Sequence, residues 1–207
     1  MSHSDSQDLI DHLGPIDIYL FDQILRGRIT SGMRVLDAGC GSGRNLVYLL
    51  RSGADVSAVD ADPENIDSVR QLAYDLSSDL SPEQFRAEPL DRLSFPDVTF
   101  DVVLCNAVLH FMTDEEEFRT ALDQLFRVLR PGGLFFARLA STIGIEHLVE
   151  KEQGRWHLLP DGSRRFLVDE EFLAEEARRL RATLADPLKT TVVQAQRSMT
   201  TWVLRKN

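Results

Sequence analysis

A glycine-rich turn between a short apolar run and a helical segment constrains the fold of this chain more than any other feature. The turn and its flanks read Val35-Leu36-Asp37-Ala38-Gly39-Cys40-Gly41-Ser42-Gly43-Arg44-Asn45. Glycines let the backbone approach a ligand without a clash from Cβ, and the free N–H groups at a helix N-terminus bind a carboxylate or a phosphate. A nucleotide-binding turn requires this strand–turn–helix context. A plain tight turn is the alternative interpretation.

The rest of the chain alternates short apolar runs with longer amphipathic ones, which predicts an α/β fold around a parallel sheet. The expected strands cover residues 33–37, 55–60, 84–88, 100–105, 134–139, 190–196 and 199–205. The expected helices are one that Pro15 opens, and others over 43–51, 62–80, 113–129, 143–152 and 169–181. Asp62 is the expected N-cap of one helix, and Thr113 begins a capping-box pattern for another.

The length of 207 residues favours one domain. We expect residues 1–30 to form an N-terminal leader and a lid helix. Residues 31–207 then form a single domain, with a substrate-side segment at about 141–168. Polar, acidic residues dominate the first dozen positions, where a frayed leader without a signal-peptide core is expected. The two cysteines have no metal-ligand spacing, so we expect no metal and a reducing, cytoplasmic location.

The charge of the chain narrows the range of partners. The net charge is −10, which argues against a general nucleic-acid binder and against docking on anionic lipid. Residues 1–100 hold 8 basic and 17 acidic residues, whereas residues 101–207 hold 15 and 16. No apolar run approaches the length that spans a bilayer. We therefore expect neither nucleic acid nor a membrane as a partner, and a chain that is a monomer or a homodimer.

The glycine turn departs from two well-known nucleotide motifs. A dinucleotide fingerprint that starts at Gly39 would need its third glycine at Arg44, and one that starts at Gly41 would need a small residue at Leu46. No Gly-Lys-Ser/Thr sequence of a Walker loop occurs. Asp60, however, ends the second expected strand 19 residues after Gly41, near the spacing of a ribose-binding carboxylate.

Five segments in order resemble the class I S-adenosylmethionine-dependent methyltransferases. The resemblance covers about residues 33–140, and the ending Gly43-Arg44-Asn45 is similar to a small tellurite-resistance-type branch. The matching segments are Asp37-x-Gly39-x-Gly41-x-Gly43, Val59-Asp60, 93–103 with Phe100-Asp101-Val102-Val103, Asn106-Ala107-Val108-Leu109-His110, and Leu129-Arg130-Pro131-Gly132-Gly133. The resemblance implies a Rossmann-like, doubly wound sheet of seven strands, in three α/β/α layers. Its strand order is 3-2-1-4-5-7-6, with strand 7 antiparallel.

The same resemblance implies S-adenosylmethionine as cofactor, bound at the carboxyl ends of strands 1 and 4. It places the glycines near the methionine part, and Asp37 near the ammonium group or the turn. Asp60 would accept both ribose hydroxyls, and Ala61 would flank the adenine. Pro89 stands where the family often has an Asp, so the backbone N–H of Leu90, or Glu88 after a small shift, could take the adenine contact. The full set of expected cofactor residues is Asp37, Gly39, Cys40, Gly41, Gly43, Arg44, Asn45, Asp60, Ala61, Leu90, Asn106, Tyr19 and Arg28.

Several of these residues have alternative roles. Asp37 could be a structural cap and Asp60 a turn residue, and Cys40 is better interpreted as a packing residue than as a nucleophile. No catalytic residue is assigned; His110 could be a general base, but it is better interpreted as a helix-facing or gate histidine. Tyr19 could cover the cofactor or pack in the core. Arg28 and Arg44 are candidates to pair with the methionine carboxylate, because Arg binds carboxylates bidentately.

The methyl acceptor is expected to be a small molecule bound by the segment after the fifth strand. Trp156, Arg164 and Arg165 are the candidate residues there, since an aromatic ring beside guanidinium groups suits an anionic or aromatic substrate. A surface loop whose arginines balance nearby acids is the alternative. The Asn/Asp-Pro-Pro-Phe/Tyr pattern of nucleic-acid amino-methyltransferases is absent at Asn106. A non-catalytic protein that binds the cofactor or a partner, and an aminopropyl transferase, are the other hypotheses.

Overall fold

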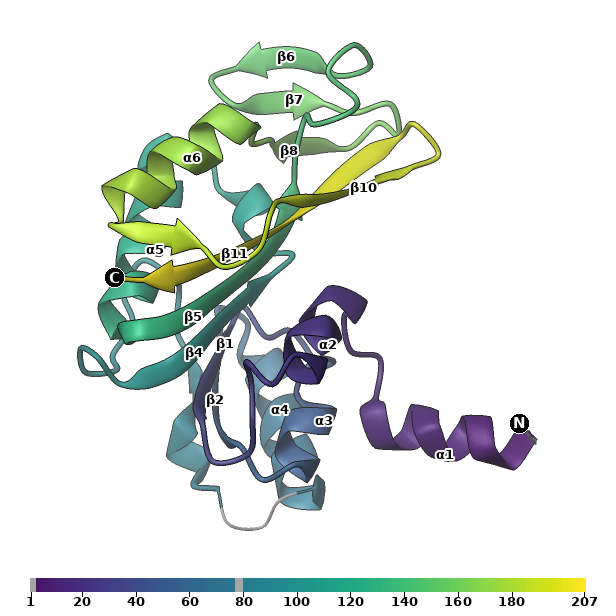
Figure 1. The fold of residues 1–207 in the computed structure, drawn as a ribbon, viewed down its shortest axis with the longest axis vertical. Helices are drawn as coiled ribbons and strands as arrows, with labels where there is room; N and C mark the ends of the chain where they lie inside the picture. The colour runs from purple at the N-terminus through teal and green to yellow at the C-terminus, as the bar shows by residue number, and fades with distance from the viewer. Residues whose placement is uncertain (1–2, 77–79) are drawn as a thin grey trace.

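The main sheet has the order that the resemblance implied. The structure is a computed structural model that describes residues 3–76 and 80–207 (Figure 1). The strands run in the order β10-β11-β5-β4-β1-β2-β3, and β9 also pairs with β11. They are β1 (Arg34–Ala38), β2 (Asp55–Asp60), β3 (Phe85–Ala87), β4 (Phe100–Asn106), β5 (Leu129–Ala140), β9 (Ala182–Leu184), β10 (Lys189–Val193) and β11 (Arg197–Lys206).

The sheet is parallel from β3 to β5, and β11 is antiparallel to β5, as predicted for the seventh strand. The outer, sixth position is divided between two strands. β10 pairs with the first half of β11 and β9 with its end, which gives eight strands instead of seven.

Helices cover both faces of this sheet, because consecutive residues of a buried strand point to opposite sides. Val35 packs in the cluster beneath α2, α3 and α4, whereas the next residue, Leu36, packs in the cluster beneath α5 and α6. The helices are α1 (His3–Leu13), α2 (Ile18–Leu25), α3 (Val47–Arg51), α4 (Pro63–Leu76), α5 (Glu115–Val128) and α6 (Glu170–Arg179), with short 3-10 turns at Pro82–Gln84 and Leu109–Phe111. The predicted three-layer architecture is confirmed.

Side-chain caps set several helix starts. Asp17 caps α2, so Pro15 lies outside the helix that it was predicted to open. Asp114, one residue after the predicted Thr113, accepts a hydrogen bond from the Glu117 backbone and begins α5. Asp169, the first residue of the helix predicted over 169–181, is the N-cap of α6. The predicted end of the α4 helix at residue 80 falls beyond 77–79, which lie outside the described residues.

The helix predicted over 143–152 is wrong. The segment instead leads into a separate antiparallel sheet of β6 (Glu150–Gln153), β7 (Trp156–Leu158) and β8 (Arg164–Phe166). Gly154 and Gly162, both at positive φ, lie in the two turns between these strands. Phe166 anchors the small sheet to the core, because its ring stacks on Phe118 at 5.1 Å.

The stretch predicted as a frayed leader contains helix α1, which extends away from the main sheet (Figure 1). Its His12 ring lies edge-on to Tyr48 of α3 at 5.7 Å. Among the residues that the structure describes, no helix is both long enough and apolar enough to cross a bilayer. The division into a leader, a lid helix and one domain stays a prediction.

Candidate functional site

The glycine turn follows β1 at the carboxyl edge of the parallel strands, where ligands of doubly wound sheets bind. Gly39, Gly41 and Gly43 all have positive φ. A Cβ on Gly39 would stand 2.4 Å from a Val108 methyl, and one on Gly43 would stand 2.9 Å from Leu72. A Cβ on Gly41 would meet nothing within 4 Å. The outer two glycines therefore permit close packing, while the middle one borders open space.

Asp60 joins the end of β2 to this turn. One carboxylate oxygen accepts from the Gly41 N–H at 2.8 Å, and the other accepts from Asp62 N and Asn65 Nδ2 at 3.0 and 3.1 Å. Asp60 also lines a cavity of about 310 Å³ with Gly39, Ala61 and Leu90. The structure thus brings together four of the predicted cofactor residues, and Asp60 holds the turn while it faces the cavity.

Two buried polar side chains at the ends of neighbouring strands have no partner. Asp37 of β1 is 1% exposed and Asn106 of β4 is 6% exposed. Neither the carboxylate oxygens of Asp37 nor the amide atoms of Asn106 form a hydrogen bond within the described part of the chain. A buried polar group left unpaired costs about 1–3 kcal/mol, so the pair points to a ligand that completes it.

Burial raises the pKa of Asp37 to about 7. The Arg44 charge opposes this rise, and the nearby Asp60 charge contributes to it. The side chain makes no capping hydrogen bond, so the structure gives the cap interpretation no support.

A second cavity of about 480 Å³ adjoins the first, because Ala107 lines this one and its neighbour Val108 lines the other. Its polar and aromatic lining includes Arg44, His110, Phe111, Arg138, Arg165 and Arg197. His110 is 7% exposed, and its Nδ1 lies 3.4 Å from the Ala140 N–H, which favours the tautomer with the proton on Nε2. Burial and the Arg165 charge lower the pKa of His110 to about 4, so the ring is neutral at neutral pH.

Helix α2 is tied across the turn and the neighbouring strands. The Asp17 N–H donates to Asn45 Oδ1 at 3.1 Å, and the Asp17 carboxylate pairs with Arg138 of β5 at 3.0 Å. The Tyr19 hydroxyl lies 2.6 Å from Thr191 Oγ1 on β10, with the Arg138 guanidinium 5.3 Å from its ring. The amide oxygen of Asn45 therefore holds α2, and Tyr19 lies beside the second cavity's Arg138.

Arg28, a predicted partner of the methionine carboxylate, is not brought to the turn. Its guanidinium donates to Asp186 at 2.7 Å and to Gln23 at 2.8 Å. Asp186 is 8% exposed, and a buried carboxylate holds a nearby guanidinium strongly. Cys40 is buried too, and burial raises the pKa of its thiol, as it does for Cys105, in agreement with a packing role.

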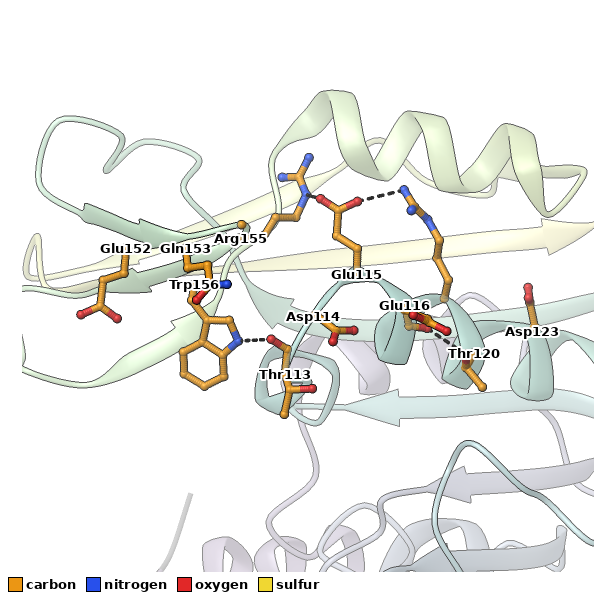
Figure 2. A pocket seen from close by; sticks show the side chains of 12 residues that line it. Thr113, Asp114, Glu115, Glu116, Thr120, Asp123, Glu152, Gln153, Arg155 and Trp156 are labelled. Atoms are coloured by element: carbon orange, nitrogen blue, oxygen red, sulfur yellow. Dashed lines mark hydrogen bonds and ion pairs between the residues drawn. The ribbon is translucent and has the colours of Figure 1, made fainter.

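The three predicted acceptor residues are separated. Arg165 lines the second cavity, with its guanidinium 4.9 Å from the Phe111 ring. Arg164, its neighbour on β8, pairs with Glu152 at 3.1 Å, and its side chain is 65% exposed. Trp156 donates from Nε1 to the Thr113 carbonyl and borders a third hollow of about 980 Å³ (Figure 2). Adjacent strand residues face opposite ways, which explains the separation of the two arginines.

The third hollow is lined by the start of α5 and by the β6–β7 turn. Glu115 forms ion pairs with Arg155 at 3.3 Å and with Arg119 at 3.2 Å, and Figure 2 shows Glu115 beside Arg155. Neither the glycine turn nor β4 contributes a residue to the lining of this hollow. No group of three or more possible metal ligands occurs among the described residues.

Sequence reasoning missed Arg138, Arg197 and Phe111. Arg138 had a visible signal, because it is the one charged residue in the otherwise apolar run 134–140. Arg197 and Phe111 had none, since their place at the cavity depends on how β11 and the turn after β4 fold back.

Comparison with known proteins places this geometry in a family. The family model described as "Methyltransferase domain" matches residues 36–137, from β1 into β5. The chain belongs to the class I S-adenosylmethionine-dependent methyltransferases. The match ends before β6–β8 and β11, so it includes the turn, Asp60 and Asn106 but neither Arg165 nor Arg197.

Curated relatives of this family cover part of the chain. The ubiquinone biosynthesis O-methyltransferase of Methylocella silvestris is 41% identical over 110 residues, which are 53% of this chain and 41% of the relative. The protein of the same name from Brucella ovis is 31% identical over 170 residues, 79% of this chain and 65% of the relative. The chain spans about half the length of the first curated methyltransferases that it matches.

Solved methyltransferases share the fold. The Burkholderia thailandensis 1,6-didemethyltoxoflavin-N1-methyltransferase, solved with 1,6-didemethyltoxoflavin and S-adenosylhomocysteine, covers all of this chain. Its TM-score is 0.70 at 25% identity, and the match covers 84% of that chain. Magnesium protoporphyrin IX methyltransferase from Synechocystis covers all of this chain and 89% of its own, with a TM-score of 0.67 and 17% identity, which shows the fold alone.

Proposed function

We propose that this protein is a methyltransferase that transfers the methyl group of S-adenosylmethionine to a small molecule. The observation that carries the proposal is the buried, unpartnered pair Asp37 and Asn106 at the carboxyl ends of β1 and β4. The pair lies in the matched region of the family, beside a glycine turn with open space at Gly41. These features fit a polar cofactor better than they fit a closed core.

The residues present fit the parts of the cofactor. Asp60, Ala61 and Leu90 of the first cavity would hold the adenosine. A carboxylate has about four acceptor positions, so Asp60 can accept ribose hydroxyls while it keeps the turn. Asp37 and Asn106 would face the amino-acid part, and Arg44 would pair with its carboxylate. The bound cofactor supplies a methyl group activated by a sulfonium.

The chain's own contribution is alignment and the exclusion of water. Tyr19 and α2, held by Asp17, cover one side, and Ala107 separates the two cavities. His110 borders the second cavity as a neutral ring that holds its proton on Nε2, and there it would donate a hydrogen bond to the acceptor. This geometry argues for a positioning role over a role as a general base.

Asn106→Ala tests the cofactor site. We expect at least a tenfold loss of S-adenosylhomocysteine affinity by calorimetry, because the variant removes a hydrogen-bonding group meant for the ligand. Thermal stability of the unliganded protein should stay equal or rise, since an unpaired buried amide disappears. Gln71→Ala, on the exposed side of α4, is the matched control. Wild-type protein that shows no saturable binding of S-adenosylhomocysteine would refute the proposal.

A non-catalytic cofactor-binding protein is the second candidate. It is favoured if S-adenosylmethionine binds tightly but a panel of acceptors yields no S-adenosylhomocysteine. The names of the relatives put ubiquinone precursors and nitrogen heterocycles into that panel.

A further inference from the structure

The second cavity gathers positive charge in a chain whose net charge is −10. Four arginines line it, namely Arg44, Arg138, Arg165 and Arg197, against one acidic residue, Asp161. They come from four different elements of the chain, the turn after β1, β5, β8 and β11. Their convergence is therefore a product of the fold and not of a local basic run.

The four guanidinium groups are not equally available. Arg138 is paired with Asp17 at 3.0 Å. Within the described residues, Arg44, Arg165 and Arg197 form no salt bridge to a carboxylate at 4.0 Å or less. Asp161 lies close enough to Arg165 and Arg197 for both charges to lower its pKa, but its Oδ1 accepts from the Ser163 N–H and hydroxyl. One carboxylate thus faces two arginines that it does not bind.

The cofactor would use one of these cations. Arg44 follows the glycine turn directly, and its charge acts on Asp37, so it serves the methionine carboxylate of the proposed function. Arg165 and Arg197 stand on β8 and at the start of β11, outside the family match. Their positive charge remains after the cofactor carboxylate is counted, and the neutral His110 adds none to it.

An apolar wall lies beside these cations. Phe111 is 56% exposed, lies 4.5 Å from the His110 ring and has the Arg165 guanidinium over its face. Leu159 and Met199 complete the wall. A guanidinium over an aromatic ring is held flat, which orients its donors for a planar anion.

We propose that the methyl acceptor is a small molecule with an anionic group, bound by Arg165 and Arg197, and with an apolar body that packs against Phe111. The inference rests on the proposed function and names the substrate class of the same site. Guanidinium groups bind carboxylates and phosphates through paired, charge-assisted hydrogen bonds. A carboxylate and a phosphate share this chemistry, and the probes below separate them.

Ligand-observed NMR on protein saturated with S-adenosylhomocysteine tests the inference. The probes are benzoate, phenyl phosphate, benzamide and benzylamine, which keep one ring and change its charge. We expect benzoate or phenyl phosphate to bind in the millimolar range, and benzamide and benzylamine to bind at least tenfold more weakly. The stronger of the two anions identifies the group that the acceptor carries.

Arg165→Gln and Arg197→Gln should each weaken binding of the anionic probe about tenfold, because each removes charge-assisted hydrogen bonds. Arg164→Gln is the matched control, since it removes the same charge one residue away on the side of β8 that pairs with Glu152. S-adenosylhomocysteine affinity and thermal unfolding should be unchanged in all three variants.

Three results would overturn the inference while the proposed function stands. They are equal binding of benzamide or benzylamine, an equal loss in the Arg164 variant, and no binding of either anion in the millimolar range by protein that binds S-adenosylhomocysteine. Failure to bind S-adenosylhomocysteine refutes the proposed function itself, and the inference with it.

Discussion

Ionisation of the buried Asp37 lowers the stability of the folded protein by an amount that depends on pH. Burial raises its pKa from the ordinary value of 3.8 to about 7, so the folded protein binds the proton more tightly than the unfolded chain does. Stability therefore falls as pH rises between these two values, and the loss is complete above pH about 7. A ligand with an ammonium group would favour the charged carboxylate. Below pH about 7, where Asp37 is protonated in the unliganded protein, its binding therefore releases a proton.

Asp37→Asn should raise the stability of the unliganded protein by a few kcal/mol at about pH 8, and by a smaller amount, about 1–2 kcal/mol, at about pH 5. The variant should bind S-adenosylhomocysteine more weakly at the higher pH, because the anionic partner of the ammonium is gone. Denaturant unfolding and calorimetry at both pH values measure these effects, with Asp75→Asn on exposed α4 as control. A stability difference that does not change with pH would contradict this account of Asp37.

The glycines of the turn should respond differently to an added methyl group. Gly39→Ala forces a Cβ to within 2.4 Å of Val108, at a φ of 77° that alanine rarely adopts. We expect a destabilisation of about 2–4 kcal/mol, and Gly39→Ala with Val108→Ala should recover the packing part. Gly41→Ala meets no atom, so it should cost only about 1 kcal/mol of stability while it reduces cofactor affinity. Denaturant unfolding of the three variants measures the stability changes, and calorimetry with S-adenosylhomocysteine measures the loss of cofactor affinity.

At the scale of elements, the position of α2, the expected lid helix, depends on its first turn. Asp17 caps the helix, donates its N–H to Asn45 and pairs with Arg138, and it is 6% exposed. These contacts join α2 to the glycine turn and to β5 at the same time. A change in the position of α2 should therefore affect both cavities.

Asp17→Ala should lower stability by about 2 kcal/mol, since it removes a helix cap and leaves Arg138 unpaired. S-adenosylhomocysteine should dissociate faster, because α2 loses its hold on the turn and on β5. Ile18→Ala, which changes a side chain that is 68% exposed on the same helix, is the control and should change neither. Stopped-flow displacement measures the rate, and equal rates in both variants would contradict the role of α2 as a cover.

The small sheet β6–β8 shows why some elements could not be predicted. Every residue of β6 is exposed, so its sequence Glu-Lys-Glu-Gln has no alternation of apolar and polar positions. It is a strand only because β7 pairs with it. The strands β1, β2 and β4 were predictable because burial on both faces selects continuous apolar runs.

At the scale of the molecule, the structure brings the predicted cofactor residues together more closely than the predicted acceptor residues. Asp60, Ala61 and Leu90 lie within a few residues of strand ends, so the order of the strands brings them together. Arg28 failed because its partner, Asp186, is 158 residues away in the chain. Arg165 and Arg197 meet only after β8 and β11 fold back, and no local pattern encodes that meeting. The near-neutral balance of the second half, against the acidic first half, was visible in the sequence, but the gathering of arginines at one cavity was not.

The place of β11 in the sheet has a consequence for synthesis of the chain. β11 separates β5 from β10, yet Ser198 at its start follows Ser141, just past the end of β5, by 57 residues. While a ribosome makes this chain, the edge of β5 that pairs with β11 stays open until β11 emerges. An open edge pairs readily with other chains. The nascent protein therefore passes through a stage at which its longest strand is the one most exposed to mispairing.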